Sequence, residues 1–176
     1  MLKSVLFLCL SALLTSAFKV KLSSDGKAEF ESGFKEITVE NMMTEFMDKE
    51  QIIGEWLTFF DNPKLCKGSS CKDGLAEVKK LDRQLQGKLR IARVNCALTK
   101  EVCKILGVKV GASPKLIFFT PDKKAFQYEG PIKAAKIKET FISEDHGYRN
   151  HKLFSENTDE TVLQGISQLA GTGNND

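Results

Sequence analysis

Two cysteines that follow an apolar run are the residues whose types and spacing could support redox chemistry. The run from Ile52 to Phe60 is followed by Pro63, and Cys66 and Cys71 then enclose the segment Lys-Gly-Ser-Ser. Apolar residues next recur at the spacing of an amphipathic helix, namely at Leu75, Val78, Leu81 and Leu85. Because a helix N-terminus favours a thiolate over a thiol, this pattern predicts a redox-active pair. The alternative is a static disulfide that fixes the loop.

Other chemistries receive less support from the sequence. A zinc site built from the cysteines would require two cysteine pairs to converge, so we expect no metal site and no cofactor. His146 and His151 lie in a polar stretch, and we expect both to be solvated surface residues. No motif around these residues indicates a hydrolase of the Cys-His-Asp type.

The first residues have the pattern of a secretory signal peptide, expected at residues 1–17. Lys3 supplies a short basic region, Val5 to Leu14 an apolar region, and Thr15-Ser16-Ala17 a small-residue cleavage site. The apolar region is too short to span a bilayer, although an N-terminal membrane anchor is the competing interpretation. Because the chain ends in Gly-Asn-Asn-Asp and not in a retention tetrapeptide, both the endoplasmic reticulum lumen and secretion are expected locations.

The composition is that of a soluble globular protein, with 41% hydrophobic and 28% charged residues. Removal of the signal lowers the formal net charge of +3 by one unit, so we expect no nucleic-acid partner and no membrane association of the mature chain. It also removes Cys9 and leaves Cys66, Cys71, Cys96 and Cys103. In an oxidising compartment disulfides are the default expectation, and four cysteines allow three connectivities.

The mature chain is expected to have an N-terminal arm (18–33), one domain (34–143) and a C-terminal extension (144–176). In the extension, 144–158 are expected to be irregular, 159–170 to form a short helix, and the end to be disordered. In the domain, strands are predicted at 34–37, 52–60, 89–94, 115–119 and 125–128. Helices are predicted at 38–49, 71–86, 99–107 and 131–143, with stops at Gly87 and Gly107.

The order of these elements predicts an α/β fold. Strands that alternate with helices favour right-handed crossovers and a parallel centre, while the turn at Pro121-Asp122-Lys123-Lys124 makes the last two strands an antiparallel hairpin. The prediction is a central mixed β-sheet flanked by helices, in the order βαβαβαββα. An apolar cluster in the first predicted helix is expected to pack under this sheet, and its members are Met42, Met43, Phe46 and Met47.

The domain resembles the thioredoxin-like domains of the protein disulfide isomerase family over residues 34–143. The residues that carry the resemblance are Trp56-Leu57, Pro63, Cys71-Lys72, Val94-Asn95-Cys96, Cys103, Gly107-Val108, Ser113-Pro114-Lys115-Leu116 and Tyr128-Glu129-Gly130. The resemblance implies a thioredoxin-like fold and a thiol-disulfide oxidoreductase of the secretory pathway. Its partners would be client proteins or peptides bearing thiols or disulfides.

The resemblance also implies roles for particular residues. Cys66 would attack the client disulfide, and Cys71 would resolve the mixed disulfide. Ser113 and Pro114, joined by a cis peptide bond, would hold the client chain as an added strand. The pair Cys96 and Cys103 would form a structural disulfide.

Three positions depart from the family pattern. The family has Cys-x-x-Cys with Gly-His between the cysteines, where this chain has a longer loop. Phe59 replaces a buried glutamate that moves a proton to and from the second cysteine, and Ala76 replaces a kink-forming proline. In the chain-entropy model, closing a disulfide loop of about six residues costs only ~0.4 kcal/mol more than closing one of about four. This difference changes the reduction potential by about 10 mV, so loop length does not decide the function. Phe59 favours the second hypothesis, a redox-inactive binding module that has a structural Cys66–Cys71 disulfide.

Overall fold

The computed structural model describes residues 20–22, 28–30, 33–48, 51–52, 55–85, 88–143 and 146–171. The chain divides into two units, Met1–Glu31 and Ser32–Asp176. In the first unit, strands β1 (Val20–Leu22) and β2 (Ala28–Phe30) pair antiparallel. The expected signal peptide and the expected helix stop at Gly87 lie outside the described residues.

The second unit is built on a six-stranded mixed sheet with the order β10-β9-β8-β6-β7-β3. Its strands are β3 (Lys35–Ile37), β6 (Trp56–Asp61), β7 (Arg90–Asn95), β8 (Lys115–Phe119), β9 (Ala125–Gln127) and β10 (Lys152–Ser155). Strands β3, β7 and β6 are parallel, and β8, β9 and β10 each pair antiparallel with their neighbours. The predicted mixed sheet, with its parallel strands and its antiparallel hairpin, is confirmed.

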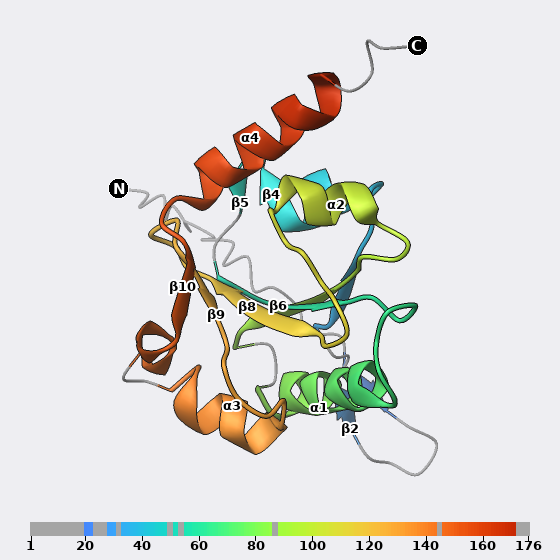
Figure 1. Cartoon of the computed structure of the whole chain (residues 1–176). Helices are drawn as coiled ribbons and strands as arrows, with labels where there is room; N and C mark the ends of the chain where they lie inside the picture. The colour runs from blue at the N-terminus through green and yellow to red at the C-terminus, as the bar shows by residue number, and fades with distance from the viewer. Residues whose placement is uncertain are drawn as a thin grey trace, which may run out of the picture. The chain divides into compact units, whose positions relative to one another are not determined.

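Helices cover both faces of this sheet (Figure 1). Helices α1 (Ser70–Leu85) and α3 (Ala134–Thr140) lie on one face, and α2 (Lys100–Ile105) and α4 (Thr158–Gly171) lie on the other. Strand β6 is buried along its whole length and contributes to both cores. Since side chains alternate along a strand, Trp56 and Phe60 join the core on the α2 side, and Leu57 and Phe59 join the core on the α1 side.

The predicted helix at 38–49 is wrong. A π-helical turn, η1 (Met42–Phe46), is followed by strand β4 (Met47–Asp48), which pairs antiparallel with β5 (Gln51–Ile52). Strand β6 therefore begins only at Trp56, later than the predicted start at residue 52. Met42, Phe46 and Met47 are buried as expected, whereas Met43 is exposed.

The side chains of Thr38 and Asn41 cap the turn from which this short helical element begins. Asn41 Oδ1 accepts a hydrogen bond from the backbone N–H of Thr38 at 2.8 Å, and Asn41 Nδ2 donates to the carbonyl of Glu36 at 2.9 Å. The Asn41 N–H also donates to the Thr38 hydroxyl at 3.4 Å, so the two side chains form a reciprocal capping box, which favours the start of a helix. The helical element is nevertheless short, because the chain is extended at Met47 (φ −125°, ψ 152°), where β4 begins and pairs with β5.

The segment 144–158 was predicted to be irregular, and this prediction is also wrong. A 3₁₀ helix, η2 (Gly147–Asn150), leads into β10, which pairs with β9 at the edge of the sheet. The helix predicted at 159–170 is confirmed as α4. Residues beyond 143 thus contribute both a strand to the sheet and a helix to one of its faces.

Candidate functional site

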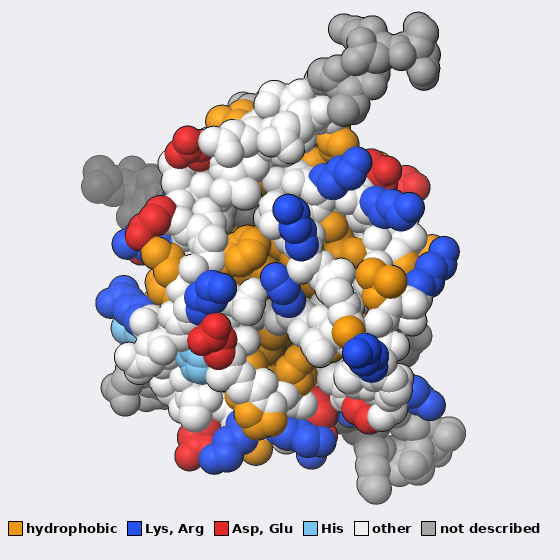
Figure 2. Space-filling view, viewed as in Figure 1, with side chains coloured by type: hydrophobic (Ala, Val, Ile, Leu, Met, Phe, Trp, Pro, Cys, Tyr) orange, Lys and Arg blue, Asp and Glu red, His pale blue; other side chains and the backbone are white. Residues whose placement is uncertain are grey.

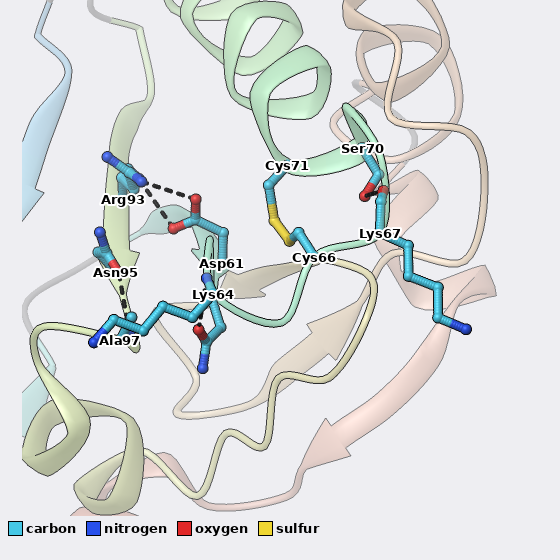
Figure 3. Close-up of a disulfide and its surroundings, with 10 residues drawn as sticks. Asp61, Lys64, Cys66, Lys67, Ser70, Cys71, Arg93, Asn95 and Ala97 are labelled. Carbon is cyan, nitrogen blue, oxygen red and sulfur yellow. Dashed lines mark hydrogen bonds and ion pairs between the residues drawn. A yellow bond between two sulfur atoms is a disulfide. The ribbon is translucent and has the colours of Figure 1, made fainter.

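The paired cysteines lie in the loop that joins β6 to α1. Strand β6 ends at Asp61, and the carbonyl of Asn62 then accepts hydrogen bonds from the N–H groups of Leu65 (2.9 Å) and Cys66 (3.0 Å). Cys66 and Cys71 form a disulfide with a Cα–Cα distance of 6.0 Å. Figure 3 shows this disulfide between the loop and the first turn of α1. Cys66 is half-buried and Cys71 is only 6% exposed.

The start of α1 is fixed by polar contacts around the second cysteine. The N–H of Asp73 donates to the carbonyl of Ser69 at 2.8 Å, and the Ser69 hydroxyl donates to the Asp73 carboxylate at 2.5 Å. The Ser70 hydroxyl donates to the carbonyl of Lys67 at 2.9 Å. Gly68 has a φ of 58°, a conformation that a side chain would strain. The loop therefore delivers Cys71 to the helix N-terminus, where the helix dipole favours a thiolate.

The segment 112–114 is next to the cysteine loop. The N–H of Lys67 donates to the carbonyl of Ala112 at 3.1 Å, which joins the loop to the residue before Ser113. Ser113 is exposed and Pro114 is half-buried. The peptide bond between Ser113 and Pro114 is trans, so the expected cis bond is wrong. The backbone contact at Ala112 brings the segment to the loop without a cis bond.

Phe59 is fully buried under the first turns of α1. A Cβ atom added at Gly74 would lie 3.1 Å from Phe59 Cε2, so the aromatic ring occupies the space beneath that turn. The position that the family resemblance assigns to a proton-transferring glutamate therefore holds an apolar ring packed against the helix. Neither Phe59 nor Gly74 offers a group that could accept a proton from Cys71.

A buried ion pair lies at the end of β6, and the sequence analysis missed it. Asp61 has a side chain that is only 1% exposed, and it accepts two hydrogen bonds from Arg93, at 3.0 Å from Nε and 2.8 Å from Nη2. Arg93 Nη1 also donates to Glu36 at 2.9 Å. Burial disfavours the charged guanidinium, but the hydrogen bonds and charges of Asp61 and Glu36 outweigh it and raise the pKa of Arg93. Figure 3 shows the pair on the strands beside the disulfide.

Cys96 and Cys103 form a second disulfide, with a Cα–Cα distance of 5.8 Å. It connects the turn after β7 to α2, and both cysteines belong to the core on the α2 side of the sheet. The Thr99 hydroxyl donates to the carbonyl of Asn95 at 2.8 Å and thereby fixes the turn between strand and helix. This disulfide is almost fully enclosed and lies in a different layer from the cysteine loop.

The histidines differ in their surroundings. His146 is exposed, and its Nδ1 lies 3.0 Å from the hydroxyl of Tyr148. His151 is half-buried: its Nδ1 accepts a hydrogen bond from the N–H of Glu129 at 3.2 Å, and its ring packs 4.9 Å from that of Phe141. The expectation of a solvated surface residue is therefore wrong for His151. In the described part of the chain, no cluster of His, Cys, Asp or Glu could hold a metal ion, and no helix is long and apolar enough to cross a membrane.

Comparisons with known proteins connect this geometry to a family. Residues 64–143 match the family model described as Thioredoxin. The chain is 36% identical over 75 residues to protein disulfide-isomerase 2-3 of Arabidopsis thaliana, covering 42% of this chain and 16% of that protein. It is 33% identical over 93 residues to the DnaJ protein ERDJ3A of Oryza sativa subsp. japonica, covering 51% and 15%. Crystal form II of ERdj5 is similar with a TM-score of 0.50 at 18% identity, over 68% of this chain and 16% of that chain.

These alignments span about a sixth of each relative, 16% and 15% of the two curated proteins. The family model covers the cysteine loop, α1 and the elements up to α3, and the structural match carries the same fold. The chain contains a thioredoxin-fold domain that is similar in sequence to part of a protein disulfide isomerase, and its paired cysteines enclose four residues.

Proposed function

We propose that the protein is a thiol-disulfide oxidoreductase that acts on protein disulfides through Cys66 and Cys71. The observation that carries the proposal is the pairing of a half-buried Cys66 with a buried Cys71 in the first turn of α1. The more accessible sulfur can be reached by a client. The enclosed sulfur has the helix N-terminus to stabilise its thiolate.

In the reducing direction, the Cys66 thiolate attacks one sulfur of a client disulfide. A bond forms between Cys66 Sγ and that sulfur, the client disulfide breaks, and the other client sulfur leaves as a thiolate. The Cys71 thiolate then attacks Cys66 Sγ and releases the second client thiolate, which leaves the Cys66–Cys71 disulfide. The client gains two electrons and the cysteine pair loses two. The oxidising direction is the reverse, with the Cys66–Cys71 disulfide as electron acceptor.

The segment at Ser113 and Pro114 is the proposed binding position for the client backbone. Its neighbour Ala112 is hydrogen-bonded to Lys67, the residue after Cys66. An extended chain laid along Ser113 would therefore pass beside Cys66, and main-chain hydrogen bonds of the added-strand type would hold it. The pattern of residues 1–17 supports a place in the secretory pathway, either in the endoplasmic reticulum lumen or outside the cell.

The test follows insulin reduction and client trapping. We expect slow reduction of insulin by the protein in excess of a control with glutathione alone. Cys71→Ala should accumulate mixed disulfides with clients, because Cys66 can attack but nothing resolves the product. Cys66→Ala, the matched control, should trap few because the remaining thiol is buried. Insulin reduction equal to the control, together with no mixed disulfide in Cys71→Ala, would exclude the enzyme.

The burial of Phe59 favours a second candidate, a binding module without redox turnover. An apolar ring under α1 removes the acid that would assist Cys71. In this case the Cys66–Cys71 disulfide would resist glutathione, and peptide binding would persist when both cysteines are replaced by alanine. A measured reduction potential of the pair separates the candidates, since a structural disulfide lies below about −300 mV.

A further inference from the structure

Three segments of the chain meet around the cysteine pair at one edge of the sheet. The N–H of Cys96 donates to the carbonyl of Asp61 at 2.8 Å, which joins the turn after β7 to the end of β6. The N–H of Lys67 donates to Ala112, and Lys115 at the start of β8 pairs with Phe60. We call the exposed surface of residues 62–72, 96–104 and 109–115 the cysteine face.

The cysteine face is rich in lysines without ion-pair partners. These lysines are Lys64, Lys67, Lys72, Lys100, Lys104, Lys109 and Lys115. In the described part of the chain none of them forms an ion pair. Elsewhere in the second unit Lys35, Lys123, Lys124, Lys133 and Lys136 are ion-paired, whereas Lys79, Lys80, Lys88, Lys138 and Lys152 are not, so the face differs from the rest of the surface in how closely its lysines are grouped. Figure 3 shows that Lys64 and Lys67 leave the loop on opposite sides of the disulfide.

Few acidic groups oppose these charges. Asp61 is buried and bound to Arg93, whereas Asp73, which accepts a hydrogen bond from Ser69, is exposed beside Lys72 and opposes part of the lysine charge. Glu101 is the remaining exposed acid of the segments that form the face. The field around Cys66 is therefore positive, and it attracts negatively charged groups of a partner.

Exposed apolar side chains lie among the lysines. Leu65, the residue before Cys66, is 54% exposed, and Leu98, in the turn after β7, is 74% exposed. Figure 2, which has the view of Figure 1, shows exposed apolar side chains with Lys and Arg side chains around them on the face that it presents. Leucines beside lysines complement a protein segment that carries both apolar and acidic residues. The leucines would not contribute to the binding of nucleic-acid phosphates, which depends on the positive charges.

We propose that the cysteine face selects extended client segments in which apolar residues beside the reacting cysteine are flanked by aspartate or glutamate. Leu65 and Leu98 contact the apolar residues, and the lysines pair with the acids on either side. The proposal rests on the proposed function in taking Cys66 as the atom that the client cysteine reaches. It adds a charge preference that the pairing of the cysteines does not itself supply.

The test measures peptide binding without any redox step. Fluorescein-labelled ten-residue peptides, with serine in place of the reacting cysteine, are titrated with the oxidised protein and followed by fluorescence anisotropy. One peptide carries leucines and glutamates, the second has lysines in place of the glutamates, and the third has serines in place of the leucines. We expect the first to bind about ten-fold more tightly than either other peptide. The advantage over the lysine peptide should shrink between about 20 mM and 300 mM NaCl.

Two triple variants of equal charge separate a local effect from net charge. Lys64→Glu, Lys67→Glu and Lys72→Glu together should abolish the preference for the acidic peptide. Lys88→Glu, Lys138→Glu and Lys152→Glu, which change exposed lysines outside the face, should retain it. Three outcomes would each overturn the proposal. The first is that both triple variants lose the preference for the acidic peptide equally, and the second is that the parent protein binds the acidic and lysine peptides equally. The third is that single-stranded DNA competes as strongly as unlabelled acidic peptide.

The result is independent of catalysis. Because the peptides contain no cysteine, loss of insulin reduction would leave the binding preference unchanged if only the redox proposal is wrong. Conversely, trapping of clients by Cys71→Ala with no charge preference would retain the oxidoreductase and exclude the selective face. Leu65→Ser with Leu98→Ser should weaken binding of the acidic peptide several-fold while leaving the effect of salt in place.

Discussion

The ion pair between Asp61 and Arg93 gives the sharpest prediction about stability. We expect Arg93→Met to lower the free energy of unfolding by ~3 kcal/mol, because it leaves the Asp61 carboxylate buried without a counter-ion. The aspartate side chain is 1% exposed and the arginine side chain 15% exposed, which places the effect at the lower end of the range for buried pairs. The contact of Arg93 with Glu36 adds little, since that glutamate side chain is 53% exposed.

A double-mutant cycle isolates the pair from the packing of the two side chains. Asp61→Asn alone removes the acceptor charge and leaves a buried guanidinium, so it should also be destabilising. The double variant Asp61→Asn with Arg93→Met should lose clearly less than the sum of the two single changes, by at least ~1.5 kcal/mol. This difference is the coupling energy of the two charges.

Unfolding in urea can be followed by the fluorescence of Trp56, the single tryptophan of the chain, which is buried at the start of β6. For a domain of this size, ~3 kcal/mol corresponds to a Tm about 10 °C lower. Lys35→Met is the matched control: it removes a lysine from an exposed pair with Glu45 and should cost below ~0.5 kcal/mol. A loss below ~1 kcal/mol in Arg93→Met, or a coupling energy near zero, would refute the reasoning.

Three further predictions concern other elements. Cys96→Ala with Cys103→Ala should cost ~2.5 kcal/mol, because closing about eight residues reduces the entropy of the unfolded chain; non-reducing peptide mapping that links either residue to the cysteine loop would contradict the pairing. The hydrogen bond from the Ala134 N–H lowers the pKa of Glu77, so its stabilising contribution is present above the unfolded pKa and lost as pH falls through the lowered folded value. Glu77→Gln should therefore flatten the acid side of a Tm–pH profile, and an unchanged profile would count against this account. Gly107→Ala should cost ~1 kcal/mol in urea unfolding because Gly107 has a φ of 66°, and an unaltered midpoint would show that no strain arises.

Much of the fold was predictable because its central elements are encoded by dense local patterns. Strand β6 carries apolar residues on both faces, and α1 repeats its apolar residues at helical spacing, so each pattern admits one interpretation. A longer helix was predicted at 38–49 because the apolar residues of this segment also have helical spacing. There the helical element ends where Met47 and Asp48 form β4 and pair with β5, and such pairing depends on a contact between segments that spacing does not describe.

Strand β10 could not be predicted from its own residues. It is a short edge strand with exposed or half-buried side chains, so it lacks the alternation that marks a half-buried strand. Its conformation comes from pairing with β9, a contact between segments separated by η2 and α3. Strands of this kind are determined by the sheet that they join.

The sequence predicted the two cysteines of the candidate site, but it did not predict the buried ion pair beside them. Cys66 and Cys71 follow from the strand, the proline and the helix that surround them. The pair of Asp61 and Arg93 joins residues on β6 and β7, and no pattern within either strand states the pairing. A signal did exist: each is a charged residue within a strand that is otherwise largely buried, and a buried charge requires a partner.

The positions of Phe59 and Asp61 on one strand bear on how fast the cysteine pair could turn over. Because side chains alternate along β6, both residues face the α1 side of the sheet, and the carboxylate lies one step further toward the cysteine loop than the aromatic ring. Both carboxylate oxygens of Asp61 already accept hydrogen bonds from Arg93. Asp61 is therefore committed to its buried ion pair with Arg93. We infer that Asp61, the acid nearest to Phe59 in sequence, does not replace the glutamate that the family resemblance assigns to position 59.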